Sequence, residues 1–133
     1  MSGSYLFPEE RVLDTYHKVW FESAERIDRL LTRGAIYSDS GWMVFTNMRI
    51  IYHGRKFLFP IDKIVFLGRH PVPGKIGIGE GYIRVDAFSP TNRVETYFFM
   101  GGGVWIWTIK RRSNELFGRM IAWNENVGRH TRI

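Results

Sequence analysis

The N-terminal part of the chain has apolar side chains at the spacing of an amphipathic helix. Together with the small polar Ser23, which continues the stripe, they recur at intervals of three or four residues at Val12, Tyr16, Val19, Ile27 and Leu30. Pro8 suits the first turn of a helix, and Gly34 suits a position just past its end. The pattern predicts an amphipathic helix within residues 1–34 and favours a continuous helix over one broken near residues 17–22. Phe21 lies off the apolar stripe, which makes it a candidate for contact with a partner.

From Ala35 onwards the pattern changes to short runs of β-branched and aromatic residues separated by turn signals. Turns are predicted at residues 38–41, 46–48 and 53–56, and Pro60 indicates an edge strand or a bulge. A segment rich in Pro and Gly, residues 68–74, carries the chain towards three further strands at 75–79, 82–88 and 93–101. The region therefore predicts seven short strands.

The helical period returns after three consecutive glycines, residues 101–103. Inward-facing positions are expected at Ile106, Ile109, Ser113, Leu116, Met120, Trp123 and Val127. A block of strands followed by one amphipathic helix indicates an α+β fold, with an antiparallel sheet or barrel and the helix packed over an open face or end. Residues 128–133 have the composition of a basic tail.

Length and composition agree with one folded domain. The 133 residues are 44% hydrophobic and 16% aromatic, which is too rich in core-forming side chains for a disordered chain. The chain has no cysteine, which excludes disulfides and thiol chemistry. No apolar run reaches the length of a membrane span, and no signal-peptide pattern opens the sequence. We therefore expect a cytoplasmic protein, either free or at the inner face of the membrane.

The basic residues are unevenly distributed. Lys and Arg number 19 against 13 Asp and Glu, a formal net charge of +6, and the excess lies in residues 54–75 and 104–133. Such patches attract phosphate groups on nucleic acids or on anionic lipids, but they also serve as a solvated surface for an aromatic-rich protein. The second interpretation is favoured for each patch taken alone.

Motifs for catalysis or metal binding are not recognisable in the sequence. The glycines of residues 74–81 do not have the spacing of a phosphate-binding loop, and the four histidines have no metal-ligand spacing. The three glycines before the last helix are explained more simply by a sharp turn than by an anion site. We expect no catalytic residues, no metal site, no cofactor and no enzymatic activity.

Trp105 and Trp107 precede the basic run Lys110-Arg111-Arg112. Tryptophan beside basic residues is typical of a helix that lies on a membrane surface. However, residues two apart on a helix point about 200° apart, so both indoles would not face the same lipid. Contact with the core or a partner is therefore favoured over membrane contact, and Trp105 and Trp107 join Phe21 as candidate partner contacts.

The segment of residues 41–52, which contains Thr46-Asn47-Met48-Arg49, resembles a signature of bacterial PH-like and GRAM-like domains, and residues 59–64 resemble a strand that follows it in that family. The resemblance covers residues 35–127. It implies a seven-stranded antiparallel PH-like split barrel capped by a C-terminal helix. The extra N-terminal helix of residues 1–34 lies outside the usual core.

The same resemblance implies a protein that binds rather than catalyses. In PH domains the loops after the first, third and sixth strands surround the open end, which makes His53, Arg55, Lys56 and Arg93 candidate contacts for an anionic ligand. The first of these loops has no Lys or Arg here, unlike many lipid-binding members.

Three functions compete. The leading hypothesis is a non-catalytic PH-like module that acts through protein association with a protein partner or as a homo-oligomer. The alternative is peripheral binding to anionic lipid or phosphoinositide membranes through the basic loops. Nucleic-acid binding is disfavoured, because neither a recognition helix nor a base-stacking motif is recognisable.

Overall fold

The structure is a computed structural model that describes residues 6–23, 37–70 and 81–128. These residues form seven strands, one α-helix and a short π-helical turn. The elements are β1 (Val12–Ser23), β2 (Asp39–Thr46), β3 (Ile50–Gly54), β4 (Leu58–Ile61), β5 (Ile64–His70), β6 (Tyr82–Phe88), β7 (Val94–Gly101), α2 (Ile106–Trp123) and η2 (Asn124–Gly128).

The predicted N-terminal helix is wrong, because residues 12–23 form strand β1. Lys18 has a φ of 57° and forms a bulge between His17 and Val19 in the pairing with β2. Because of the additional residue, the successive inward-facing side chains Tyr16 and Val19 are three residues apart instead of the two of a regular strand. This spacing resembles the apolar stripe of a helix. The remaining predicted helical residues, 24–34, lie outside the described residues.

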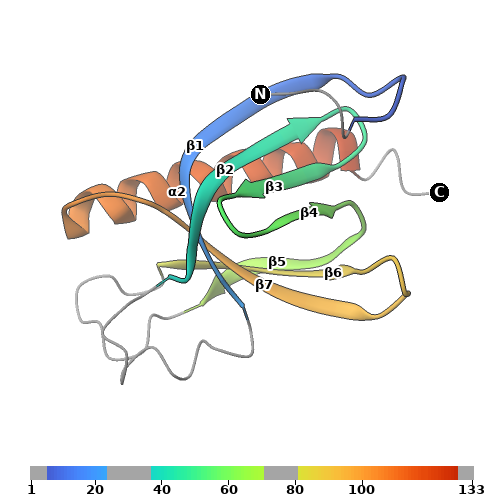
Figure 1. Ribbon diagram of the computed structural model, residues 1–133. Coiled ribbons are helices and arrows are strands. Elements are labelled where there is room, and N and C mark those ends of the chain that lie inside the picture. Colours follow the sequence, from blue (N-terminus) through green and yellow to red (C-terminus); the bar gives the residue numbers. More distant parts are fainter. Residues whose placement is uncertain (1–5, 24–36, 71–80, 129–133) are drawn as a thin grey trace.

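All seven strands belong to one antiparallel sheet with the order β4-β3-β2-β1-β7-β6-β5. β1 pairs with β2 over most of its length and with β7 through Val19–Ser23. In Figure 1, β1 passes from the layer of β2, β3 and β4 into the layer of β5, β6 and β7, so one strand belongs to both layers. Within the described residues no pairing joins β4 to β5, and the sheet does not close.

Most of the other predicted elements are confirmed. The turn at residues 46–48 joins β2 to β3, and Pro60 lies in the edge strand β4. The strands predicted at 82–88 and 93–101 correspond to β6 and β7. The turn predicted at 38–41 is wrong, because β2 begins at Asp39. The strand predicted at 75–79 lies outside the described residues.

Helix α2 covers the sheet with most of the apolar stripe that the sequence predicted, but the expected inward position Ile106, at the start of the helix, is 46% exposed. Its buried residues are Ile109, Ser113, Leu116, Met120 and Trp123. The indole N–H of Trp123 donates a hydrogen bond to the carbonyl oxygen of Thr46 over 2.7 Å, and the Tyr16 hydroxyl lies 3.1 Å from the Glu115 carboxylate. These contacts fix the helix against β1 and β2. Each large apolar side chain in the core contributes about 1.5–3 kcal/mol by its burial.

Candidate functional site

Phe21, a candidate partner contact, lies in the core instead. Its side chain is only 4% exposed, and its ring centroid lies 5.2 Å from that of Tyr52 and 5.5 Å from that of Phe99. In a strand Phe21 faces the same side as Val19, so its off-stripe position existed only in the helical interpretation. Phe21 is therefore a core residue and is not available for contact with a partner.

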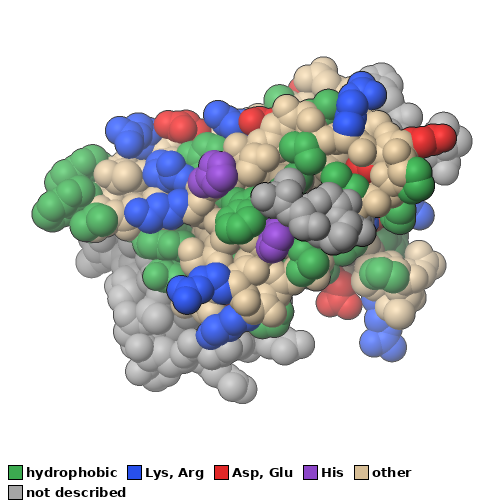
Figure 2. All heavy atoms as spheres, turned by 45° about the horizontal axis from the view of Figure 1, so that its top comes forward, with side chains coloured by type: hydrophobic (Ala, Val, Ile, Leu, Met, Phe, Trp, Pro, Cys, Tyr) green, Lys and Arg blue, Asp and Glu red, His purple; other side chains and the backbone are tan. Residues whose placement is uncertain are grey.

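The most exposed apolar segment of the described residues is Val104–Trp107, which we call the apolar tip. Val104 is 80% exposed, Trp105 58%, Ile106 46% and Trp107 65%. The segment joins β7 to the start of α2. In Figure 2 hydrophobic side chains gather at this end of the molecule, on the left, with Lys and Arg side chains beside them.

The two indoles of the apolar tip lie together, contrary to the sequence argument. Trp105 precedes the helix and has extended backbone angles, φ −107° and ψ 150°. The rule that residues two apart on a helix diverge therefore does not apply to this pair. The ring centroids lie 5.2 Å apart with an angle of 1° between the planes, so the indoles form a parallel stack that faces outward.

Close backbone packing holds the base of the apolar tip. The Gly101 N–H donates to the Ser113 hydroxyl over 2.9 Å, and the Gly102 N–H donates to the Lys18 carbonyl over 2.7 Å. A Cβ on Gly101 would lie 2.5 Å from the Arg112 carbonyl carbon. The glycines therefore allow β7 and the first turns of α2 to approach closely.

Exposed basic side chains follow the apolar tip on α2 and lie at its base. Lys110 and Arg111 are exposed on α2, and the first turn of the helix contains no acidic residue. Lys18 is exposed on the β1 bulge, and its Cγ lies 3.0 Å from the place of a Cβ on Gly102, directly below the tip. Arg111 has one weak ion pair, 3.8 Å from Glu115. The surroundings of the tip are thus predominantly cationic.

The predicted anion contacts Arg55 and Lys56 lie together on the turn between β3 and β4. They line a hollow of about 540 Å³ with Tyr37, Ser38, Asp39 and Ser40. The buried Asp39 carboxylate accepts hydrogen bonds from the backbone N–H groups of Lys56 and Phe57 and from the Tyr52 hydroxyl. Burial, together with the neighbouring Asp39 carboxylate, raises the pKa of Tyr52. Asp39 thus shapes the turn that presents both cations.

The other two predicted anion contacts do not line this hollow. His53 is half-buried in β3, with its ring 4.6 Å from the Trp42 ring. Arg93 lies in the turn between β6 and β7, where its N–H donates to the Ser89 hydroxyl. The structure therefore brings Arg55 and Lys56 together and places Arg93 on another turn.

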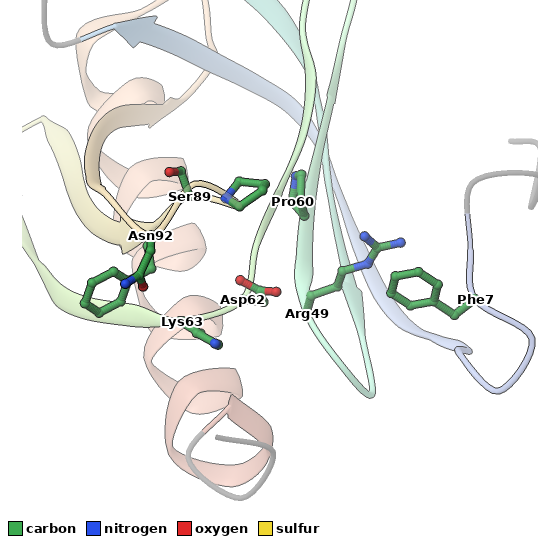
Figure 3. A pocket seen from close by; sticks show the side chains of 9 residues that line it. Phe7, Arg49, Pro60, Asp62, Lys63, Ser89 and Asn92 are labelled. Atoms are coloured by element: carbon green, nitrogen blue, oxygen red, sulfur yellow. The ribbon is translucent and has the colours of Figure 1, made fainter. Parts of the chain in front are cut away.

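That other turn borders a hollow of about 320 Å³ between the ends of β3, β4 and β6 (Figure 3). Lys63 and Asp62 are exposed at its rim. Arg49 contributes a guanidinium that is bound to Glu10, with nitrogen–oxygen distances of 2.9 and 3.0 Å, and that lies 4.4 Å from the centroid of the Phe7 ring. The charge of Arg49 in this hollow is therefore already compensated by Glu10.

The outer edge of β5 forms a separate exposed surface. β5 is the last strand of the sheet order, and Val65 and Phe66 on it are 52% and 46% exposed. A bulge between Ile64 and Phe66 turns two successive side chains outward. The opposite edge strand, β4, has four residues and contains Pro60, which cannot donate a backbone hydrogen bond. Of the two edges, β5 is better suited to accept another strand.

The structure and the comparisons add no catalytic or metal-binding assignment. Among the described residues, no group of three His, Asp or Glu side chains is placed to hold a metal ion. None of the described helices is long and apolar enough to cross a membrane. The chain matches no protein-family model, no curated protein and no solved structure.

The sequence did not indicate that Lys18 and Val104 belong to a common surface, and Ile106, which was expected to face inward, is exposed on that surface. The run Gly101–Trp107, three glycines followed by four large apolar residues, was the available signal for an exposed junction. Lys18 had no such signal, because its position beside the apolar tip follows from the bulge in β1 and from the hydrogen bond between its carbonyl and Gly102.

Proposed function

We propose that this chain is a non-catalytic, PH-like binding module that acts through protein association, and that it self-associates through the outer edge of β5, where no other strand of the described residues pairs. The PH-like assignment is supported by the strand order with its C-terminal helix and by the Thr46–Arg49 segment. The observation that carries the mode of association is the exposed, seven-residue edge strand β5.

An edge strand presents a row of backbone donors and acceptors to any strand that comes alongside it. Edge strands of monomeric proteins are usually interrupted by charges, proline or shortness. β4 has two such devices, its length of four residues and Pro60. β5 has a bulge at Ile64–Phe66 and one charged residue, Arg69, but it is longer and its run from Val65 to Gly68 has neither charge nor proline. This contrast favours pairing at β5.

A second copy of the chain is the simplest partner for this edge. Two β5 strands that run antiparallel about a twofold axis present the same surface to each other, as a self-complementary dimer requires. Val65 and Phe66, which are exposed in the single chain, would be covered by the opposite copy. The result would be one continuous sheet through both subunits.

The test is the molar mass of the protein in solution over a range of concentrations, measured by light scattering on a size-exclusion column. We expect the wild type to dimerise and Val65→Lys to shift it to the monomer, because a charge at an edge opposes strand pairing. Val94→Lys is the matched control, since Val94 is also 52% exposed but lies at the start of the inner strand β7.

Two outcomes would contradict self-association through β5. One is a wild-type protein that stays monomeric up to about 1 mM, where even an association worth about 4 kcal/mol would be half complete. The other is a dimer that Val65→Lys and Val94→Lys weaken to the same extent, which would place the contact elsewhere.

The alternative function, binding to an anionic membrane through the basic loops, is favoured by one observation, the adjacent Arg55 and Lys56. Each basic residue near an anionic surface contributes on the order of 1 kcal/mol. Because Arg93 lies on a different turn, the pair alone supports only weak, salt-sensitive attraction.

A further inference from the structure

The apolar tip exposes four consecutive large apolar side chains at one end of the molecule (Figure 2). A patch of this kind on a protein surface marks a place that another molecule covers. The junction of β7 and α2 lies at one end of the molecule in Figure 1, so the tip is placed where it can enter a lipid layer.

The chemistry of the stacked indoles favours a lipid surface. Tryptophan combines a large apolar body with one N–H donor and is enriched where hydrocarbon meets the headgroup region of a bilayer. Because Trp105 and Trp107 lie in parallel, 5.2 Å apart, both can enter the same layer of the bilayer. Val104 and Ile106 provide further apolar surface beside them.

The charges around the apolar tip select an anionic surface. Lys18, Lys110 and Arg111 are exposed next to it, and the first turn of α2 contains no acidic residue. Basic residues at the level of the lipid headgroups are attracted by anionic lipids and can bind their phosphate groups. An apolar groove on a protein would have no comparable need for three surrounding cations.

The apolar tip is also held in one arrangement before any contact is made. The hydrogen bonds of Gly101 and Gly102 attach its base to α2 and to β1. A guanidinium N–H of Arg112 donates to the carbonyl of His17, and the same guanidinium lies 4.7 Å from the centroid of the Tyr16 ring. Little conformational entropy is therefore lost when the tip is covered.

We propose that the apolar tip Val104–Trp107 inserts into the headgroup region of an anionic lipid bilayer, while Lys18, Lys110 and Arg111 contact the lipid phosphates. This site differs from the basic hollow of Arg55 and Lys56, and it needs no headgroup-specific pocket. The proposal does not rest on self-association through β5, because the two surfaces share no residue.

The experiment is co-sedimentation of the full chain with vesicles of phosphatidylcholine alone and with vesicles in which a third of the lipid is phosphatidylserine. We expect binding to the second kind only, with weakening at raised salt. Tryptophan fluorescence should shift to shorter wavelength on binding, because the indoles leave water.

Paired variants separate the tip from the remainder of the surface. Trp105→Ala with Trp107→Ala should weaken binding at least about tenfold and remove the fluorescence shift, because most of the inserted apolar surface is lost. Leu58→Ala is the matched control, since Leu58 is 53% exposed but lies on β4.

The charge variants test the attraction to anionic lipid. Lys110→Glu with Arg111→Glu should abolish the preference for anionic vesicles. Lys63→Glu, also at an exposed basic residue, should change this preference less than about threefold. Val65→Lys, in the same assay, tests whether binding depends on the β5 dimer.

Several results would overturn the proposal. Equal recovery on neutral and anionic vesicles would contradict the role of the basic residues. Full binding by the double tryptophan variant would contradict insertion of the tip. A protein that binds only through Arg55 and Lys56 would return the membrane contact to the basic hollow. If no vesicle is bound and the oligomeric state depends on Trp105 and Trp107, the tip is a protein contact.

Discussion

The turn between β2 and β3 is hydrogen-bonded to the segment before β1 through the side chains of Thr46, Asn47 and Arg49. The Thr46 hydroxyl donates to the Glu10 carboxylate over 2.7 Å, and Arg49 donates to the same carboxylate. The Asn47 side chain accepts the N–H of Arg11 over 2.8 Å. Thr46, Asn47 and Arg49 thus have a structural role in this chain, because their side chains hold the turn against the segment before β1.

Glu10 should make the stability of the protein depend on pH in the acid range. Burial acts to raise the pKa of Glu10, but the hydrogen bonds from Arg49, Thr46 and the Phe7 backbone outweigh it and lower the pKa. A carboxyl with a lowered pKa stabilises the folded state above its unfolded pKa of about 4.3 and loses this contribution as the pH falls through the folded value.

Replacing Glu10 by Gln should therefore cost about 2–3 kcal/mol of unfolding free energy at neutral pH and progressively less as the pH falls below about 4. Denaturant unfolding of both proteins between about pH 3 and pH 7 measures the difference. Glu9→Gln is the control, because Glu9 is exposed. A cost for Glu10→Gln that is equal at all these pH values would contradict the argument.

At the scale of single residues, the sequence revealed which side chains were unusual but not always where they lie. Trp105 and Trp107 were predicted to contact the core or a partner; the core contact is wrong, because both side chains are exposed. Their parallel stack could not be predicted, because it depends on the extended backbone of Trp105 immediately before the helix. The burial of Phe21 was missed for a different reason, the wrong assignment of its element.

Helix α2 contains one glycine that the structure does not require. Gly118 is exposed in the middle of the helix, and a Cβ there would meet nothing within 4 Å. Gly118→Ala should therefore raise the unfolding free energy by about 0.5–1 kcal/mol, since alanine has the higher helix propensity. Chemical denaturation of the two proteins checks the value.

Gly101→Ala is the matched contrast, because a Cβ at this position would lie 2.5 Å from the backbone of Arg112. It should destabilise the protein by about 1–3 kcal/mol, as overpacking does elsewhere. If Gly101→Ala were as harmless as Gly118→Ala, the close contact between β7 and α2 would be wrong.

At the scale of elements, hydrophobic periodicity predicted α2 and the strands that alternate regularly. It failed for β1, because the bulge at Lys18 shifts the alternation within a single strand. The aromatic and β-branched residues of β1, including Thr15, Val19, Trp20 and Phe21, favour a strand by composition. Composition was the better indicator here, since a bulge changes spacing but not residue type.

At the scale of the whole molecule, β1 makes the N-terminal segment part of the domain. Residues 35–127, which the sequence delimits as the barrel with its capping helix, lack the strand that joins the two layers. A chain shortened to residues 35–133 should therefore fail to fold. The amide spectrum of the shortened chain should lack the dispersion of the full chain, and a well-dispersed spectrum would contradict the central position of β1.

The position of β1 also determines the order in which the molecule can assemble. β2 follows it closely in sequence, but the β7 residues Tyr97–Gly101 that pair with Val19–Ser23 are made only after all other strands. Contacts between residues so distant along the chain slow folding and delay it during synthesis. One side of β1 therefore stays without its neighbour until β7 has been synthesised, and in that interval the nascent chain is most exposed to aggregation or to capture by a chaperone.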